Sequence, residues 1–201
     1  MNIAIINYGL GNLHSVHKAV AFAGGDAFVT DDAREILNAD KIILPGVGAF
    51  ADGMRGLNAC GLVPVIRKAV VLGKPFLGIC LGMQLLFESS EEQGSHQGLG
   101  LLSGDVVYFR HPGIRVPQIG WNQIDVRKAH RLLDHINDGD YFYFNHGFYC
   151  VPGDQADILT ETEYGAPFTS AVQRGNLFGT QFHPEKSQKT GLQILKNFVE
   201  I

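Results

Sequence analysis

The sequence has few cysteines, and their spacing excludes two kinds of structure. Only Cys60, Cys80 and Cys150 occur in 201 residues. They are odd in number, lie far apart and form no Cys-x-x-Cys pair, so neither a disulfide framework nor a cysteine zinc site is expected. This cysteine usage favours a reducing compartment, and a cytoplasmic location is therefore predicted.

Long apolar runs and an excess of basic charge are also missing. No apolar run approaches the ~20 residues that a membrane span requires. Residues 1–7 have neither the basic region nor the cleavage site of a signal peptide. The formal net charge is −4, which gives no electrostatic reason to expect a nucleic acid or an anionic membrane as a partner.

The amino-acid composition is typical of a globular domain. Hydrophobic residues make up 45% of the chain and charged residues 18%, which suffices for a sizeable core. No repeat, low-complexity tract or linker interrupts the chain. One domain over residues 1–201 is therefore predicted.

The first half of the chain alternates between two periodicities. Apolar runs at 3–6, 27–29 and 41–44 are typical of buried strands, and helical spacing follows at 13–23 and 32–37. This order predicts a parallel sheet with right-handed crossover connections.

The second half, from about residue 101, is richer in short β-type runs. Residues 170–173 and 177–181 flank a Gly-Asn turn typical of a hairpin, and residues 190–200 have helical spacing. The sequence therefore predicts an α/β fold, with a largely parallel central sheet, helices on both faces and a β-rich C-terminal half.

Residues 78–82 read Gly-Ile-Cys-Leu-Gly, between an apolar run and a helical pattern predicted over 81–88. This is the thiol form of the nucleophile elbow Gly-x-Ser-x-Gly, in which glycines permit a tight strand-to-helix turn. The helix N-terminus favours the Cys80 thiolate, and the Leu81 N–H is a candidate oxyanion donor. The alternative is that Cys80 is a small buried hydrophobe.

A glycine-rich loop, Pro-Gly-Val-Gly at 45–48, directly follows the predicted strand 41–44. Ligands of open α/β sheets bind beyond the carboxyl ends of strands. Taken alone, the loop is an ordinary turn. Beside the elbow, we interpret it as the second oxyanion donor, through the N–H of Val47 or Gly48.

A cysteine nucleophile needs a base, and the base needs an orienting group. Of eight histidines, only His183 stands in a segment, Gln-Phe-His-Pro-Glu at 181–185, that supplies both. Pro184 biases His183 toward an extended conformation, in which residues i and i+2 project to one side. Glu185 is therefore predicted to hold the His183 ring, the alternative being a surface turn.

Five segments carry a resemblance to a known family. They are Asn-Tyr-Gly-Leu-Gly-Asn-Leu at 7–13, Leu-Pro-Gly-Val-Gly-Ala-Phe at 44–50, Gly-Ile-Cys-Leu-Gly-Met-Gln at 78–84, Gly-Trp-Asn at 120–122 and Gly-Thr-Gln-Phe-His-Pro-Glu-Lys-Ser at 179–187. Together they resemble the class I (triad) glutamine amidotransferases, which have a three-layer, flavodoxin-like fold. Within that family they are most similar to the glutaminase subunits of imidazole glycerol phosphate synthases, of histidine biosynthesis.

The resemblance implies the chemistry of the site. Cys80 would attack the side-chain amide of L-glutamine and form a γ-glutamyl thioester, while His183 moves the proton and Glu185 orients the ring. Gln84 would help to hold the substrate. Glu92 would bind its α-amino group, with Glu91 as a near alternative.

The resemblance also implies a partner. Ammonia would pass to a separate (β/α)8-barrel cyclase/synthase subunit in a heterodimer, which makes imidazole glycerol phosphate and aminoimidazole carboxamide ribotide. The implied interface residues are Asn12, Trp121, Asn122 and Tyr143. No metal or cofactor is implied.

Two segments depart from the family pattern. The chain has His146, Gly147 and Phe148 near the expected glutamine carboxylate, where the family usually has His-Ser-Tyr. It also has Gln118 and Ile119 where the family usually has His-Met. Three alternatives follow: a paralogous glutaminase serving another ammonia acceptor, a stand-alone hydrolase of γ-glutamyl amides, and a non-catalytic binding subunit.

Overall fold

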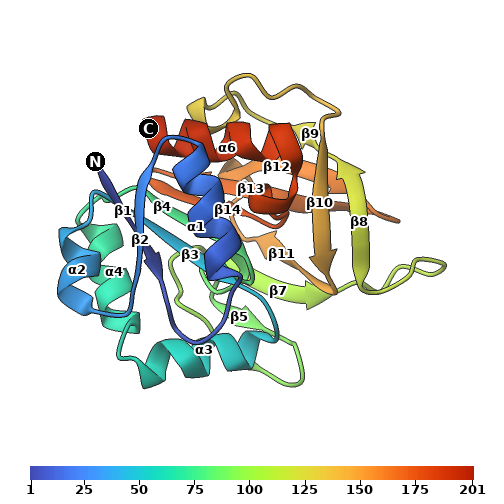
Figure 1. The fold of residues 1–201 in the computed structure, drawn as a ribbon. Helices are drawn as coiled ribbons and strands as arrows, with labels where there is room; N and C mark the ends of the chain where they lie inside the picture. The colour runs from blue at the N-terminus through green and yellow to red at the C-terminus, as the bar shows by residue number, and fades with distance from the viewer.

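A twelve-stranded sheet runs through the computed structural model, which describes residues 1–201 (Figure 1). Its parallel part comes from the N-terminal half, in the spatial order β2-β1-β3-β4. These strands are β1 (Asn2–Ile6), β2 (Asp26–Thr30), β3 (Lys41–Gly46) and β4 (Phe76–Cys80). All three pairings among them are parallel, as the alternation of strands and helices predicted.

Helices cover both faces of the parallel part. They are α1 (Leu13–Phe22), α2 (Ala33–Asn38), α3 (Phe50–Ala59), α4 (Val63–Val71), α5 (Leu81–Gln84) and α6 (Gln188–Glu200). The alternation along β1 divides the core, because Ala4 and Ile6 pack with α2, α3 and α4, whereas Ile3 and Ile5 pack with α1 and α6. The result is the predicted three-layer arrangement.

The C-terminal half extends the sheet with mostly antiparallel strands. They are β5 (Ser89–Ser90), β6 (His96–Gln97), β7 (Gly104–Tyr108), β9 (Asp125–Val126), β11 (Phe148–Pro152), β12 (Ile158–Glu163), β13 (Pro167–Arg174) and β14 (Leu177–Thr180). β13 and β14 form the predicted hairpin, with Gly175 at a φ of 55° in its turn. Short 3₁₀ turns lie at η1 (Arg131–Leu133), η2 (Gln155–Asp157) and η3 (Pro184–Lys186).

Strand β14 joins the two halves. It pairs antiparallel with β13 and parallel with β4, so that Thr180 lies opposite Ile79. The ends of β4 and β14 therefore deliver Cys80 and His183, 103 positions apart in the chain, to the same edge of the sheet. A separate two-stranded ribbon, β8 (Gln118–Gln123) and β10 (Tyr141–His146), lies beside this edge (Figure 1).

The helix predicted over 81–88 is wrong in length. α5 ends at Gln84, and the carbonyls that would continue it are turned toward a later segment. Leu85 O accepts from Leu99 N at 2.9 Å, and Glu88 O accepts from Gly98 N at 2.8 Å. Since these long-range bonds satisfy the backbone, one helical turn suffices after the elbow. The segment 89–100, which follows α5, contains the two short strands β5 and β6.

No helix of the structure combines the length and the apolar character that crossing a membrane would demand.

Candidate active site

Cys80 occupies the strained turn that the elbow motif predicts. Its φ is 54° and its ψ is −110°, a backbone conformation that residues other than glycine rarely adopt. Glycine is required at positions 78 and 82, on either side of Cys80, because a Cβ there would overlap with backbone atoms. A Cβ on Gly78 would lie 2.6 Å from the Gly82 carbonyl oxygen, and one on Gly82 would lie 1.8 Å from the Leu44 oxygen. Steric exclusion therefore holds the thiol at the end of β4.

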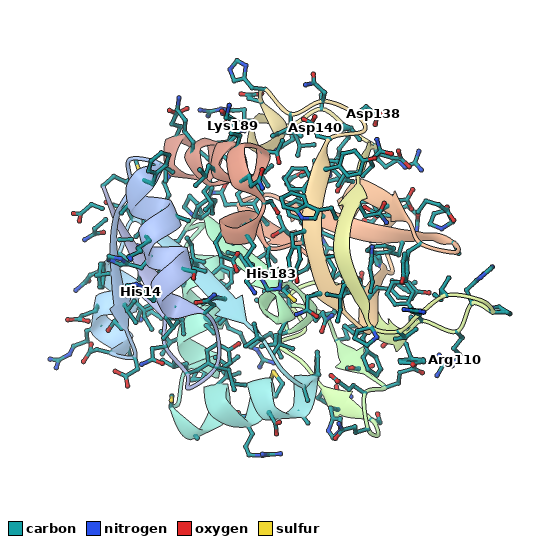
Figure 2. All side chains as sticks on the ribbon, turned by 45° about the vertical axis from the view of Figure 1, so that its right-hand side comes forward. His14, Arg110, Asp138, Asp140, His183 and Lys189 are labelled. Atoms are coloured by element: carbon teal, nitrogen blue, oxygen red, sulfur yellow. The ribbon has the colours of Figure 1, made fainter.

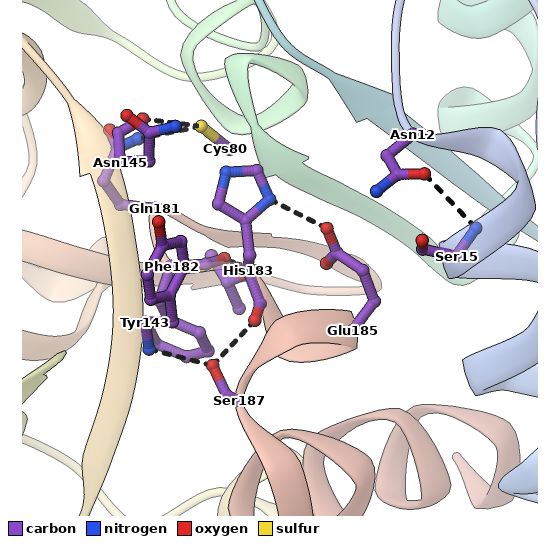
Figure 3. Close-up of polar contacts among 11 residues, drawn as sticks. Asn12, Ser15, Cys80, Tyr143, Asn145, Gln181, Phe182, His183, Glu185 and Ser187 are labelled. Atoms are coloured by element: carbon purple, nitrogen blue, oxygen red, sulfur yellow. Dashed lines mark hydrogen bonds and ion pairs between the residues drawn. The ribbon is translucent and has the colours of Figure 1, made fainter. Parts of the chain in front are cut away.

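His183 and Glu185 form a buried pair, with 2.9 Å between Nδ1 and Oε1. Their side chains are 2% and 1% exposed. The other ring nitrogen, Nε2, has no hydrogen-bond partner and is turned toward the Cys80 sulfur (Figure 3). The contact was predicted for an extended segment, but only His183 is extended, and Glu185 lies in the 3₁₀ turn η3. The turn brings the carboxylate under the ring.

The charges around His183 favour its imidazolium form. Burial by itself lowers the pKa of the ring, but the interactions with Cys80 and with the Glu185 carboxylate outweigh it and raise the pKa to about 10. A thiolate facing this protonated ring is the state in which the sulfur is nucleophilic. The arrangement can thus supply both a nucleophile and the proton that a leaving amine needs.

Two hydrogen-bonded groups hold the backbone of His183 in place. Its N–H donates to the Tyr143 carbonyl at 2.9 Å, and its carbonyl accepts from the Ser187 hydroxyl at 2.7 Å. The Ser187 oxygen in turn accepts from the Tyr143 N–H at 2.9 Å. Strand β10 therefore fixes the base, as the dashed lines of Figure 3 show.

A cavity of about 160 Å³ opens between these groups. Eleven residues line it: Val47, Gly48, Cys80, Leu81, Gln84, Glu92, Asn145, His146, Gly147, Phe148 and His183. The structure thus brings together the predicted nucleophile, base, oxyanion residues and substrate-binding residues. Glu185 lies behind His183, outside the lining.

The glycine-rich segment predicted to supply the second oxyanion donor continues from β3, whose last residue, Gly46, pairs with Cys80. A Cβ on Gly46 would lie 2.6 Å from the Tyr8 hydroxyl oxygen, so glycine is required for this close approach. That hydroxyl donates to the Pro45 carbonyl at 2.8 Å, and its burial, with the nearby Cys80, raises the pKa of Tyr8. Tyr8, which the sequence reasoning did not single out, therefore anchors the loop that carries Val47 and Gly48.

The two candidate carboxylates have different surroundings. Glu92 lines the cavity, with Oε2 accepting from the Phe50 N–H at 2.7 Å at the start of α3. Glu91 lies outside the lining, paired with Arg110 at 2.6 Å, and that guanidinium and the Tyr108 N–H lower its pKa. The geometry thus favours Glu92 over Glu91 as a ligand for a substrate ammonium.

Comparison with known proteins places the chain in a family. The family model for "Glutamine amidotransferase class-I" matches residues 4–201. The chain is a class I glutamine amidotransferase. It is 48% identical to "Imidazole glycerol phosphate synthase subunit HisH" of Aquifex aeolicus, over 98% of this chain and 96% of that protein. It is 53% identical to the protein of the same name from Moorella thermoacetica, over 99% of this chain and 94% of that one.

Solved structures agree on the fold of this amidotransferase. The structure of PurLQS from Thermotoga maritima superposes with a TM-score of 0.77 at 21% sequence identity, covering 99% of this chain and 97% of that one. A crystal structure described as that of a glutamine amidotransferase superposes with a TM-score of 0.76 at 16% identity, covering 98% of this chain and 99% of that one.

His146 shapes the far wall of the amidotransferase cavity. It is buried, and burial is the main cause that lowers its pKa to about 4, so the ring is neutral near pH 7. Its Nδ1 lies 2.8 Å from the Phe148 carbonyl, which can only accept, so Nδ1 carries the hydrogen. His146 therefore holds the backbone of Gly147 and Phe148 against the cavity.

The predicted interface residues lie in three different settings. Trp121 and Tyr143 are paired across the β8–β10 ribbon, with ring centroids 6.2 Å apart, on its outward side. Asn122 points to the opposite side and donates to the Glu163 carbonyl at 2.8 Å. Asn12 caps α1 by accepting from the Ser15 N–H at 3.4 Å, beyond Glu185 in Figure 3.

Three further polar residues near the amidotransferase triad escaped the sequence reasoning. Asn145 O lies 3.9 Å from the Cys80 sulfur, Gln181 Nε2 lies 3.6 Å from it, and Ser187 clamps His183. Gln181 stands two positions before His183, and the i, i+2 spacing expected of an extended segment is the only signal that could have found it. In Figure 2, His183 lies between α1 and the β8–β10 ribbon. No group of three or more His, Cys, Asp and Glu side chains is placed to hold a metal ion.

Proposed function

We propose that the chain is the glutaminase subunit of an imidazole glycerol phosphate synthase, acting in the cytoplasm in histidine biosynthesis. One observation carries the proposal: a thiol at a strained elbow faces an imidazole whose other nitrogen lies 2.9 Å from a buried carboxylate. The identities of 45–53% with subunits of that synthase support the assignment. The family match over residues 4–201 supports a single amidotransferase domain.

In the first step, the Cys80 thiolate attacks the side-chain carbonyl carbon of L-glutamine. The imidazolium of His183 gives its Nε2 proton to the departing nitrogen, so ammonia leaves and a γ-glutamyl thioester remains. Glu185 stabilises the charged ring and fixes its orientation through Nδ1. The N–H groups of Leu81 and of Val47 or Gly48 would stabilise the developing oxyanion, and the presence of these residues in the cavity lining supports this role.

In the second step, water replaces ammonia in the cavity. The now neutral His183 takes a proton from water, the hydroxide adds to the thioester carbonyl, and the C–S bond breaks to release glutamate and the thiolate. The proton on His183 restores the starting state. Both steps balance with the side chains of the triad, glutamine and water alone.

The cavity lining offers the groups that would hold the amino acid. Glu92 would bind the α-ammonium group, and the backbone of Gly147 and Phe148, which lines the same cavity, would bind the α-carboxylate. Gln84 reaches the same space from α5. The absence of a hydroxyl at Gly147 and Phe148 leaves recognition of the carboxylate to backbone groups.

The outward side of the β8–β10 ribbon is the surface proposed for the (β/α)8-barrel partner. Ile119, Trp121 and Tyr141 are 64%, 45% and 53% exposed, which makes an apolar and aromatic patch. The same ribbon contacts the site, since Asn145 lies beside the Cys80 sulfur. A partner docked here would stand next to the point where ammonia is released.

The test is reconstitution with the barrel subunit of an imidazole glycerol phosphate synthase. We expect glutamine-dependent formation of imidazole glycerol phosphate by the pair, and glutaminase activity of the isolated chain well below that of the pair. Cys80→Ala should abolish the glutamine-dependent reaction and leave the ammonia-dependent reaction of the partner intact.

Other outcomes would select among the alternatives. Full glutaminase activity without the partner would indicate a stand-alone hydrolase. Hydrolysis without transfer to the barrel subunit would indicate another ammonia acceptor. Failure of a glutamine-like chloroketone to alkylate Cys80 in the complex would indicate a binding subunit.

A further inference from the structure

A line of buried amides leads from the cavity wall to the sulfur. Gln84 Nε2 lies 2.9 Å from the Phe148 carbonyl oxygen and 3.0 Å from Gln181 Oε1. Gln181 Nε2 in turn lies 3.6 Å from Cys80 Sγ. The Gln181 side chain is fully buried and Gln84 is 5% exposed, so these contacts do not compete with bulk water.

The first member of the line dictates the orientation of all the others. The Phe148 carbonyl can only accept, and His146 Nδ1 already donates to it from one side. Gln84 must therefore present its NH₂ group to this carbonyl, and the second hydrogen of that group meets Gln181. Because Gln84 offers a donor there, Gln181 must offer its oxygen, and its own NH₂ group is left facing the sulfur. Reversing either amide would set two donors or two acceptors against each other.

We propose that Gln181 is a further residue of the catalytic machinery, which donates an N–H to the Cys80 sulfur and steadies it as a thiolate. Gln84 is then a positioning residue that acts through Gln181. The assignment rests on the proposed use of Cys80 as a nucleophile. A thiolate accepts hydrogen bonds better than a neutral thiol does, so a fixed donor favours the reactive form.

Gln181 would donate this hydrogen bond to the sulfur without adding a charge to the site. The titratable groups that face Cys80 are His183 with Glu185 behind it, Tyr8 and Cys150, while His146 and Glu92 line the same cavity. Replacing Gln181 by methionine keeps the length of the side chain and all of these groups. A change in the reactivity of the thiol would therefore report the lost hydrogen bond.

The experiment compares the full chain with Gln181→Met by alkylation with iodoacetamide across a pH range, with each cysteine followed by mass spectrometry. The expected result for Cys80 is about a fivefold slower reaction at pH 7 and a rise of about 0.7 in the pH midpoint, the size of one typical net hydrogen bond. Exposed Cys60 is an internal reference for reagent and pH, and buried Cys150 should stay unreactive while the fold is intact.

An unchanged midpoint for Cys80, with Cys150 still protected, would overturn the proposal. If Cys150 becomes reactive in Gln181→Met, a second variant, Gln84→Met, tests the proposal instead. It keeps Gln181 beside the sulfur but removes the hydrogen bond that orients the Gln181 amide. A rise in the Cys80 midpoint of about half that size supports the line of amides, and no rise rejects it. Alkylation needs no glutamine turnover, so a chain that passes this test but fails to feed the synthase would count against the proposed function alone.

Discussion

The two sides of the active site are held in place by different forces. On the sulfur side, strands β3 and β4 and helix α5 approach so closely that glycine is required at Gly46, Gly78 and Gly82. On the base side, the His183 N–H donates to the Tyr143 carbonyl and the His183 carbonyl accepts from the Ser187 hydroxyl. The sulfur is positioned by steric exclusion, and the base is positioned by polar contacts with the strand that faces the proposed partner.

This difference has a consequence for how each side tolerates change. Overlap of atoms rises steeply with distance, so the sulfur side should respond to added bulk by losing its structure. Hydrogen bonds are individually worth about 0.5–1.5 kcal/mol, so the base side should respond in a graded way. The base side is therefore the one on which a docked partner can act without unfolding the chain.

The largest effect is expected for Gly82→Ala. The new methyl would lie 1.8 Å from the Leu44 carbonyl oxygen, so β3 and α5 must separate, and we expect a loss of more than about 3 kcal/mol in the free energy of unfolding. The matched control is Gly73→Ala, whose Cβ meets only one atom at 3.9 Å and whose φ of 74° should cost about 1 kcal/mol. Urea unfolding of both variants checks this, and equal losses would refute steric positioning.

An effect of intermediate size is expected from pH, with opposite signs for two buried histidines. The raised pKa of His183 contributes stability that is fully present below about pH 6.5 and is lost as the pH rises to about 10. The lowered pKa of His146 contributes stability that is present above about pH 6.5 and is lost as the pH falls to about 4, on the order of 3 kcal/mol.

Unfolding free energies measured across this range test both signs. Cys80→Ser removes the sulfur whose interaction raises the pKa of His183, and it should flatten the alkaline decline. His146→Gln should flatten the acid decline and leave the alkaline one unchanged. If each variant altered the opposite limb, the assignment of charges in the site would be wrong.

The smallest effect is expected for Ser187→Ala. Loss of the hydroxyl leaves the Tyr143 N–H and the His183 carbonyl without this partner, so we expect kcat for glutamine hydrolysis to fall about fivefold with little change in KM. Thr190→Ala is the matched control, because its hydroxyl bonds the backbone carbonyls of Tyr141 and Ser187 but contacts neither His183 nor the Ser187 hydroxyl. Equal falls in both variants would show that the clamp on His183 has no special role.

Local sequence was enough for the elbow and for the order of strands and helices. The contact that requires Gly78 is with Gly82, four positions along the chain, and the unbroken apolar run from Ile3 to Ile6 marks a strand that is buried on both faces, so both patterns are legible in one chain. Long-range hydrogen bonds decided the rest. They ended α5 at Gln84 and drew Glu91 to Arg110, leaving Glu92 in the cavity.

What the sequence by itself determined is therefore the tight turn at Cys80 and the alternating architecture that places strand ends together. Only the tertiary structure decided which groups surround the Cys80 sulfur. They are the amide of Gln181, the carbonyl of Asn145 and the oriented ring of His183. The reason is physical. Steric requirements of a tight turn act on neighbours in the chain, whereas the direction of a buried amide depends on partners that are remote in the chain and close only after folding.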